Sequence, residues 1–99
     1  MSVRVVAEFP AAQGKLEDLI ASLKVALTDT RAFEGCQGIE SLLDADRETI
    51  VLLEDWRSFE DYDRYLAWRV ETGMLDLLDQ LLAGGRVGFV PRKCVSADC

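Results

Sequence analysis

The sequence predicts an α+β protein whose secondary-structure elements follow the order β-α-β-β-α-β. Three observations support this order. The spacing of apolar residues changes from every second residue to a helical spacing at Lys15, a short polar break separates two apolar segments in mid-chain, and a helical region precedes a last apolar stretch. This order is the ferredoxin-like arrangement, a four-stranded antiparallel sheet with both helices on one face. The length of 99 residues suits one domain, so a single domain is expected over residues 1–99.

The first strand and the first helix follow from the change in period. Residues 3–9 alternate between a more apolar and a more polar face, and Pro10 ends this strand. Gln13 and Gly14 form a turn. Apolar side chains then recur at helical spacing up to about Thr30, at Leu16, Leu19, Ile20, Leu23 and Leu27. This pattern predicts an amphipathic helix of four to five turns.

The middle of the chain predicts a β hairpin. Residues 34–38 contain two glycines and are expected to form a loop, after which residues 39–46 form the second strand. A polar turn at residues 46–48 leads into residues 49–56, which give the clearest strand pattern in the chain. Because the connection is short, the two strands are expected to be antiparallel neighbours.

The last third of the chain predicts a second helical region and a final strand. Ser58 has the position of a helix N-cap, with Asp61 three residues later as in a capping box. A helix is expected over residues 59–71, followed by a further turn or two over residues 74–82. Two glycines end this region, and residues 86–92 are expected to form the last strand.

The third predicted strand suggests a homodimer. Ile50 and Leu52 lie on one face of this strand, and Val51 and Leu53 lie on the other. A strand that is apolar on both faces needs cover on both. Because one layer of helices covers a single face, a second copy of the chain is expected to cover the other.

Composition excludes several classes of function. The chain has no histidine, which rules out a histidine-based triad, a histidine-bound haem, a zinc site with histidine ligands and a histidine general base. Its 11 Lys and Arg residues against 18 Asp and Glu residues give a net charge of −7. This acidic balance argues against nucleic acid and against an anionic membrane as partners.

Location and cofactor chemistry are also constrained. No apolar run approaches the ~20 residues of a membrane span, and the first residues do not fit a signal peptide. Cys36, Cys94 and Cys99 show no paired spacing, which favours a cytoplasmic protein with reduced thiols. The acidic residues near the hairpin turn lack the glycine and the final glutamate of a calcium-binding loop, so no metal site is expected.

Several segments together resemble the antibiotic biosynthesis monooxygenase domain. They are the first strand with Gly14 before the first helix, Glu34-Gly35-Cys36, Leu53-Glu54-Asp55-Trp56, Ser58 at the start of the second helix, and Tyr65-Leu66-Ala67-Trp68-Arg69 followed by Gly73. The resemblance extends over nearly the whole chain. It implies a dimeric α/β barrel, in which the sheets of two ferredoxin-like subunits pack face to face.

The resemblance also implies a function. Members of this family oxidise electron-rich polycyclic phenols or quinols with dioxygen and need no metal or flavin, because the deprotonated substrate supplies the electrons. Related members degrade haem that a histidine holds, a route this chain lacks. Many family sequences carry a histidine where Tyr65 stands, and tyrosine is a weak base near neutrality. The alternative is therefore a non-catalytic dimeric module of the same fold that binds a small molecule or supports an assembly.

Four residues are candidates for catalysis under the quinol hypothesis. Tyr62, Tyr65 and Arg69 have helical spacing, so their polar ends can meet and stabilise an oxyanion. Glu54 is the one carboxylate inside the most apolar strand, where burial would raise its pKa and suit it to act as a base. The competing interpretations are core packing for the tyrosines, and for Glu54 a salt bridge with Arg69 or Arg86 or exposure at the strand end.

Three aromatic residues are candidates for binding an aromatic substrate. Trp56 and Trp68 would flank the substrate ring, with Phe59 beside them. The competing interpretation places them in the core or at a dimer interface. Cys36 has no histidine to activate it and is interpreted as a small buried apolar residue.

Overall fold

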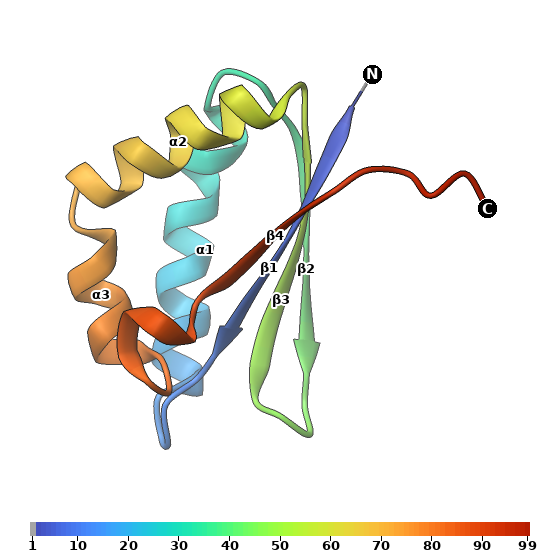
Figure 1. The fold of residues 1–99 in the computed structure, drawn as a ribbon. Helices are drawn as coiled ribbons and strands as arrows, with labels where there is room; N and C mark the ends of the chain where they lie inside the picture. Colours follow the sequence, from blue (N-terminus) through green and yellow to red (C-terminus); the bar gives the residue numbers. More distant parts are fainter. Residues whose placement is uncertain (1) are drawn as a thin grey trace.

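The computed structural model describes residues 2–99 and confirms the predicted α+β fold (Figure 1). The first half contains β1 (Val3–Pro10), α1 (Leu16–Ala32), β2 (Cys36–Asp44) and β3 (Thr49–Trp56). The second half contains α2 (Phe59–Glu71), α3 (Met74–Leu81), the short 3-10 helix η1 (Gly85–Gly88) and β4 (Val90–Cys94).

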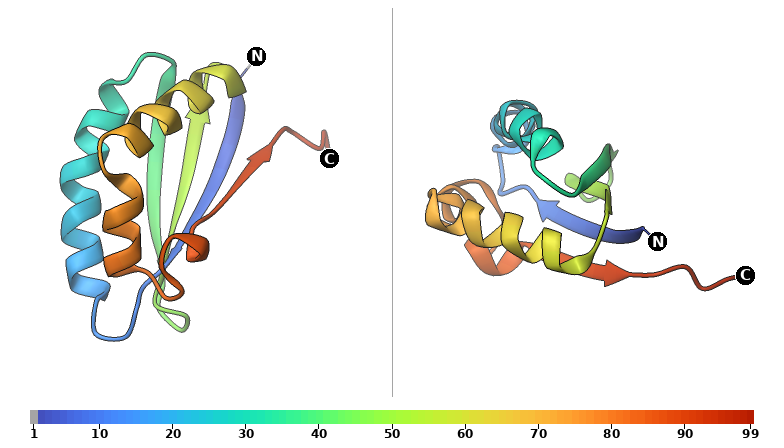
Figure 2. Two further views of the ribbon diagram at one scale, coloured as in Figure 1. Left: turned by 60° about the vertical axis from the view of Figure 1, so that its left-hand side comes forward. Right: turned by 90° about the horizontal axis from the view of Figure 1, so that it is seen from above.

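The four strands form one antiparallel sheet in the order β2-β3-β1-β4. The three α-helices lie on one side of this sheet, and the other side carries no helix (Figures 1 and 2). On the side of the helices, β1 presents Val5 and Ala7, and β3 presents Leu52, Glu54 and Trp56, all of which are buried. The alternation predicted from the sequence therefore holds in both central strands.

The structure corrects the start of the second strand. β2 begins at Cys36, although residues 34–38 were expected to form a loop and residues 39–46 the strand. The register with β3 shifts between Cys36 and Gly38, so the strand accommodates an irregularity and continues through the glycine. Pairing then runs on to Asp44, opposite Thr49.

The last strand also begins later than predicted. Residues 85–88 form η1, and β4 covers Val90–Cys94, whereas residues 86–92 were expected to be extended. The cause is a contact with α3: the backbone N–H and the guanidinium of Arg86 both donate hydrogen bonds to the Asp79 carboxylate. This contact holds the chain in a turn beside α3 before it enters the sheet.

The core consists of two neighbouring groups of buried side chains. The larger group lies between the sheet, α1 and α3 and includes Phe9, Leu27 and Leu52. The smaller group contains Val5, Trp56 and Tyr62, against which Phe33, Cys36, Tyr65 and Leu66 pack.

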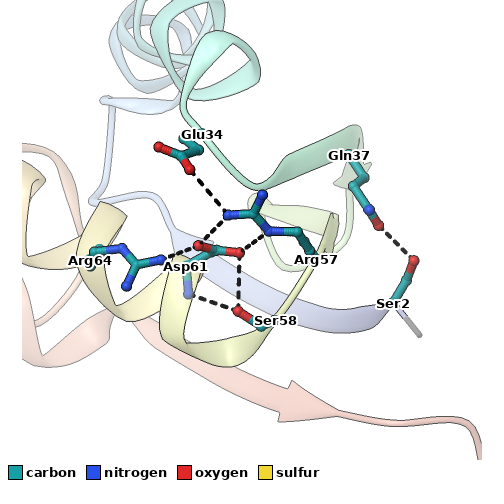
Figure 3. Close-up of polar contacts among 7 residues, drawn as sticks. All are labelled: Ser2, Glu34, Gln37, Arg57, Ser58, Asp61 and Arg64. Carbon is teal, nitrogen blue, oxygen red and sulfur yellow. Dashed lines mark hydrogen bonds and ion pairs between the residues drawn. The ribbon is translucent and has the colours of Figure 1, made fainter.

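A polar network fixes the start of α2 (Figure 3). Ser58 is the N-cap, as predicted, and its Oγ accepts the backbone N–H of Asp61 at 3.1 Å. The Asp61 carboxylate is buried and accepts hydrogen bonds from Arg57 Nε at 2.7 Å and Arg57 Nη2 at 2.9 Å, and it also pairs with Arg64. The bonds from Arg57 are the main cause of a pKa for Asp61 well below its ordinary value. Asp61 therefore stays ionised and anchors the helix to the preceding loop.

Candidate functional site

A cavity of about 150 Å³ lies between the helices and the sheet. Its lining combines side chains from both core groups and from all three α-helices, and it is mostly apolar, with Phe9, Leu52 and Met74 among its members. The polar side chains of the lining are Glu54, Tyr62, Tyr65, Arg69 and Thr72. An apolar cavity with a few converging polar groups is the usual form of a small-molecule site.

Glu54 is the buried acid of this cavity. It is 4% exposed, and its Oε1 accepts a hydrogen bond from the indole N–H of Trp56 at 2.9 Å. Burial raises its pKa to about 7, while the bond from Trp56 acts in the opposite direction. No ion pair within residues 2–99 includes Glu54, so the predicted alternatives of a salt bridge with Arg69 or Arg86 are not found.

Tyr65 and Arg69 connect α2 to the end of α1. Arg69 Nε donates to the Tyr65 hydroxyl at 2.9 Å, and Arg69 Nη2 donates to Thr30 Oγ1 at 2.9 Å and to the Ala26 carbonyl at 2.5 Å. The hydroxyls of Thr30 and Tyr65 are 2.7 Å apart and share a hydrogen bond. This network fixes both the arginine and the tyrosine at the wall of the cavity.

Tyr62 lies beside Glu54 and remains a hydroxyl at neutral pH. Burial is the main cause that raises its pKa above the ordinary value, and the nearby charge of Glu54 adds to it. Tyr62 can therefore donate a hydrogen bond to an anion, but it cannot act as a base near neutrality.

The structure thus brings four of the predicted site residues, Glu54, Tyr62, Tyr65 and Arg69, to one cavity. The three predicted substrate-binding aromatics do not line it. Trp56 is fully buried behind the lining, where its ring centroid is 5.2 Å from that of Tyr65 and 5.7 Å from that of Tyr62. Trp56 therefore supports the site by holding the Glu54 carboxyl from behind.

The other two aromatics lie on opposite flanks of α2. Trp68 packs against Phe33, with ring centroids 5.6 Å apart, and its ring lies 4.7 Å from the guanidinium carbon of Arg69. Phe59, at the start of α2, lies 5.6 Å from the Lys93 ammonium group. Neither ring faces the space that a cavity ligand would fill.

Sequence reasoning missed one polar residue that organises the site. Thr30 is 1% exposed, and its hydroxyl bonds to both Tyr65 and Arg69. The signal was its position three residues after Leu27, which continues the apolar face of α1. A polar residue on such a face must find a hydrogen-bond partner, and here the partners come from α2.

Residues 2–99 have neither a cluster of metal ligands nor a helix that could span a membrane. No group of three or more His, Cys, Asp or Glu side chains in this range is placed to hold a metal ion. None of the helices described here is long and apolar enough to cross a membrane.

The fold and the cavity define a class of α+β proteins in which helices cover one side of an antiparallel sheet and a small, partly open apolar site lies between the two. The particular family follows from the sequence, because the model of the antibiotic biosynthesis monooxygenase family matches residues 2–69. The chain belongs to this family, which confirms the resemblance found in its motifs. A comparison with curated proteins finds no match.

Solved structures share the fold of this chain. Protein SO0527 of Shewanella oneidensis is similar with a TM-score of 0.79 and 23% identity, over 93% of this chain and 87% of that one. Rv0793 of Mycobacterium tuberculosis is similar with a TM-score of 0.72 and 27% identity, over 100% and 98%. A protein named antibiotic biosynthesis monooxygenase gives a TM-score of 0.79 at 14% identity, over 96% and 98%, which shows a shared fold.

Proposed function

We propose that the protein is a cofactor-independent monooxygenase that oxidises a hydroxylated, quinol-type aromatic molecule with dioxygen. One observation carries this proposal: a buried carboxyl, Glu54, lies on an apolar cavity with a pKa of about 7. A base with such a pKa can remove the proton of a ring hydroxyl near neutral pH. Membership of the antibiotic biosynthesis monooxygenase family supports the same reaction class.

The proposed reaction begins with proton transfer from a ring hydroxyl to Glu54. The phenolate then gives one electron to dioxygen, and the resulting superoxide and substrate radical combine in a carbon–oxygen bond. Cleavage of the O–O bond leaves one oxygen atom on the ring as a carbonyl, and the other departs as water with the two hydrogens that the substrate loses. Dioxygen is the oxidant and the ring is the reductant, so the electrons balance without a cofactor.

The polar residues of the cavity have a defined part in this scheme. The hydroxyl of Tyr62 and the cationic Arg69 lie on the same cavity as Glu54 and would stabilise the phenolate as it forms. Tyr65 holds Arg69 through the bond to its Nε. The apolar remainder of the lining reduces the contact of the radical pair with water.

We expect the purified protein to consume dioxygen when it is given a hydroquinone in the absence of added metal and flavin. An oxygen electrode and a panel of hydroquinones with one to three rings would measure this. Uptake at the rate of buffer autoxidation for every member of the panel would overturn the proposal. Saturable quenching of Trp56 and Trp68 fluorescence without turnover would instead identify the binding module that the missing histidine favours.

The protein is also proposed to act as a homodimer through the side of the sheet that carries no helix. Val6, Val51 and Leu53 lie on this side in the two central strands, and Leu42 and Val90 of the edge strands are 44% and 38% exposed. Val6, Leu53, Val51 and Leu42 adjoin across three strands, and Glu8 separates them from Val90. Exposed apolar side chains gathered in this way mark sites of protein association.

Charges at the rim suit a copy of the same chain. Arg4 pairs with Asp55 at one end of this face, and Arg92 pairs with Glu8 at the other. Each end therefore presents both signs of charge, as a self-complementary contact requires.

Leu53→Glu is expected to convert the dimer to a monomer, because it places a carboxylate at the centre of the apolar face. Light scattering at micromolar concentration would give the mass of each form. Val25→Glu is the matched control, since Val25 on α1 is 74% exposed and lies on the helical side of the molecule. A wild-type mass of one chain, or equal masses for wild type and Leu53→Glu, would contradict the dimer.

A further inference from the structure

The size of the cavity limits the substrate more than the family resemblance does. The cavity measures about 150 Å³. An engineered apolar cavity of about this volume in another protein holds benzene, and pockets for drug-sized ligands begin at roughly 300 Å³. There is room for one aromatic ring with short substituents.

Most walls of the cavity are parts of the packed core, and one side, at Thr72, Gly73 and Leu77, is exposed. Phe9, Leu27, Leu52 and Leu78 are each no more than 5% exposed, and Tyr62 is 2% exposed. Moving such side chains to admit a second ring would disrupt close packing and is unfavourable. The buried part of the cavity therefore holds one ring, and a second ring would have to lie on the exposed side.

Arg69 gives this cavity a positive charge that no carboxylate neutralises. The ion pairs within residues 2–99 do not include it. Its hydrogen bonds go to uncharged acceptors, the hydroxyls of Tyr65 and Thr30 and the carbonyl of Ala26, through Nε and Nη2. A half-buried guanidinium with neutral partners keeps the capacity to bind an anion strongly.

Glu54 and Arg69 act on different parts of a ligand. Both line the cavity, but they form no ion pair with each other, and the Glu54 carboxyl is held by Trp56. Glu54 can therefore meet a ring hydroxyl while Arg69 meets a second polar group on the same ring. A neutral hydroquinone would offer Arg69 no anion until a hydroxyl of the hydroquinone is deprotonated.

We propose that the ligand of this cavity is a single-ring phenol or hydroquinone that carries a carboxylate, with the carboxylate bound by Arg69 and a ring hydroxyl directed to Glu54. The redox part of this assignment rests on the proposed function, whereas the ring size and the charge rest on the cavity itself.

Binding without turnover tests this assignment. Under nitrogen, the protein is titrated with 2,5-dihydroxybenzoate, with methylhydroquinone as the neutral single ring, and with 1,4-dihydroxy-2-naphthoate as the acidic double ring, each followed by calorimetry. The dissociation constant of 2,5-dihydroxybenzoate is expected to be at least about tenfold lower than that of either other compound. Equal or tighter binding of methylhydroquinone or of the naphthoate would overturn the proposal.

Variants of two arginines show whether Arg69 is the source of the preference. Arg69→Gln is expected to remove the tenfold preference for the carboxylate, and Arg69→Lys, which keeps the charge, to restore much of it. Arg31→Gln is the matched control, because Arg31 also bonds to a backbone carbonyl, that of Ile39, but does not line the cavity. An unchanged preference in folded Arg69→Gln would overturn the role of Arg69.

Oxygen uptake then separates the two proposals. Preferential binding of 2,5-dihydroxybenzoate without oxygen uptake in air would support the ligand assignment and overturn the monooxygenase function. Oxygen uptake with neutral or polycyclic quinols, and none with the carboxylated single ring, would support the monooxygenase function and overturn the ligand assignment. If none of the three compounds binds and none is oxidised, both proposals fail.

Discussion

Replacing Glu54 with glutamine is expected to lower kcat/KM for quinol oxidation by at least about 100-fold, the usual contribution of a general base. Glutamine has the same shape, and its side-chain oxygen can still accept the hydrogen bond that Trp56 donates at 2.9 Å in the wild type. What the variant lacks is the capacity to take a proton. Oxygen uptake at pH 8 with the best hydroquinone measures the effect, and activity within twofold of the wild type would exclude Glu54 as the base.

The pH dependence of the wild type gives a second readout of the same substitution. Burial raises the pKa of Glu54 to about 7, and a base must be deprotonated to act. The kcat/KM of the wild type should therefore rise with pH up to about 7 and level off above it. Glu54→Gln should lose this rise, whereas a purely structural role for Glu54 would leave the profile unchanged.

Measurements of stability show whether a loss of activity in Glu54→Gln comes from unfolding. The pKa of Glu54 rises from 4.5 to about 7 on burial, so the folded state binds this proton more tightly than the unfolded state does. Its contribution to stability is thus fully present below about pH 4.5 and is lost as the pH rises to about 7. Above pH 7 the buried charge is unfavourable by up to about 3 kcal/mol, from 1.36 kcal/mol per pKa unit.

Glutamine carries no such charge. Glu54→Gln should therefore unfold at a higher urea concentration than the wild type at pH 8 and at a similar concentration at pH 4. A variant that is more stable at pH 8 yet inactive separates catalysis from folding. A variant less stable than the wild type at pH 8 would show that Glu54 is not held in the apolar environment described here.

Local sequence patterns were sufficient to predict the fold and to place most polar groups of the candidate site. The period of two in residues 49–56 put Glu54 on the same face as Leu52 and Trp56, and helical spacing put Tyr65 and Arg69 on one side of α2. These relations depend only on the geometry of a strand and a helix. Once the order of the elements was known, the face of β3 that carries Glu54 and the side of α2 that carries Tyr65 and Arg69 had to meet between the sheet and the helices.

The partners of these groups depend on contacts that such patterns do not contain. Arg69 was a candidate partner for Glu54, but in the structure it bonds to Ala26 and Thr30, which are 43 and 39 residues away. The indole of Trp56 was expected to face a substrate, and instead it lies behind the carboxyl. Which of two nearby groups a side chain meets depends on how α1 and α2 pack, and residue spacing does not determine that.

Replacing Gly35 with alanine is expected to lower the free energy of unfolding by about 2–4 kcal/mol. Gly35 has a φ of +93°, which is unfavourable for alanine by about 1 kcal/mol. A Cβ atom at this position would also lie 2.5 Å from Cβ and Cγ of Asp61. Asp61 cannot move away, because Arg57 and Ser58 hold its carboxylate, so the overlap adds about 1–3 kcal/mol of overpacking. Urea denaturation at pH 7 measures the loss.

Gly14→Ala separates the two causes of this loss. Gly14 has a φ of +77°, but a Cβ atom there would meet nothing within 4 Å, so this variant should lose only the ~1 kcal/mol of backbone strain. The excess loss in Gly35→Ala then measures the overlap with Asp61. Because Asp61 anchors the start of the helix that carries Tyr62, we expect folded Gly35→Ala protein to bind quinols more weakly as well. Equal losses of stability in the two variants would show that the Glu34-Gly35-Cys36 motif does not act through its contact with this helix.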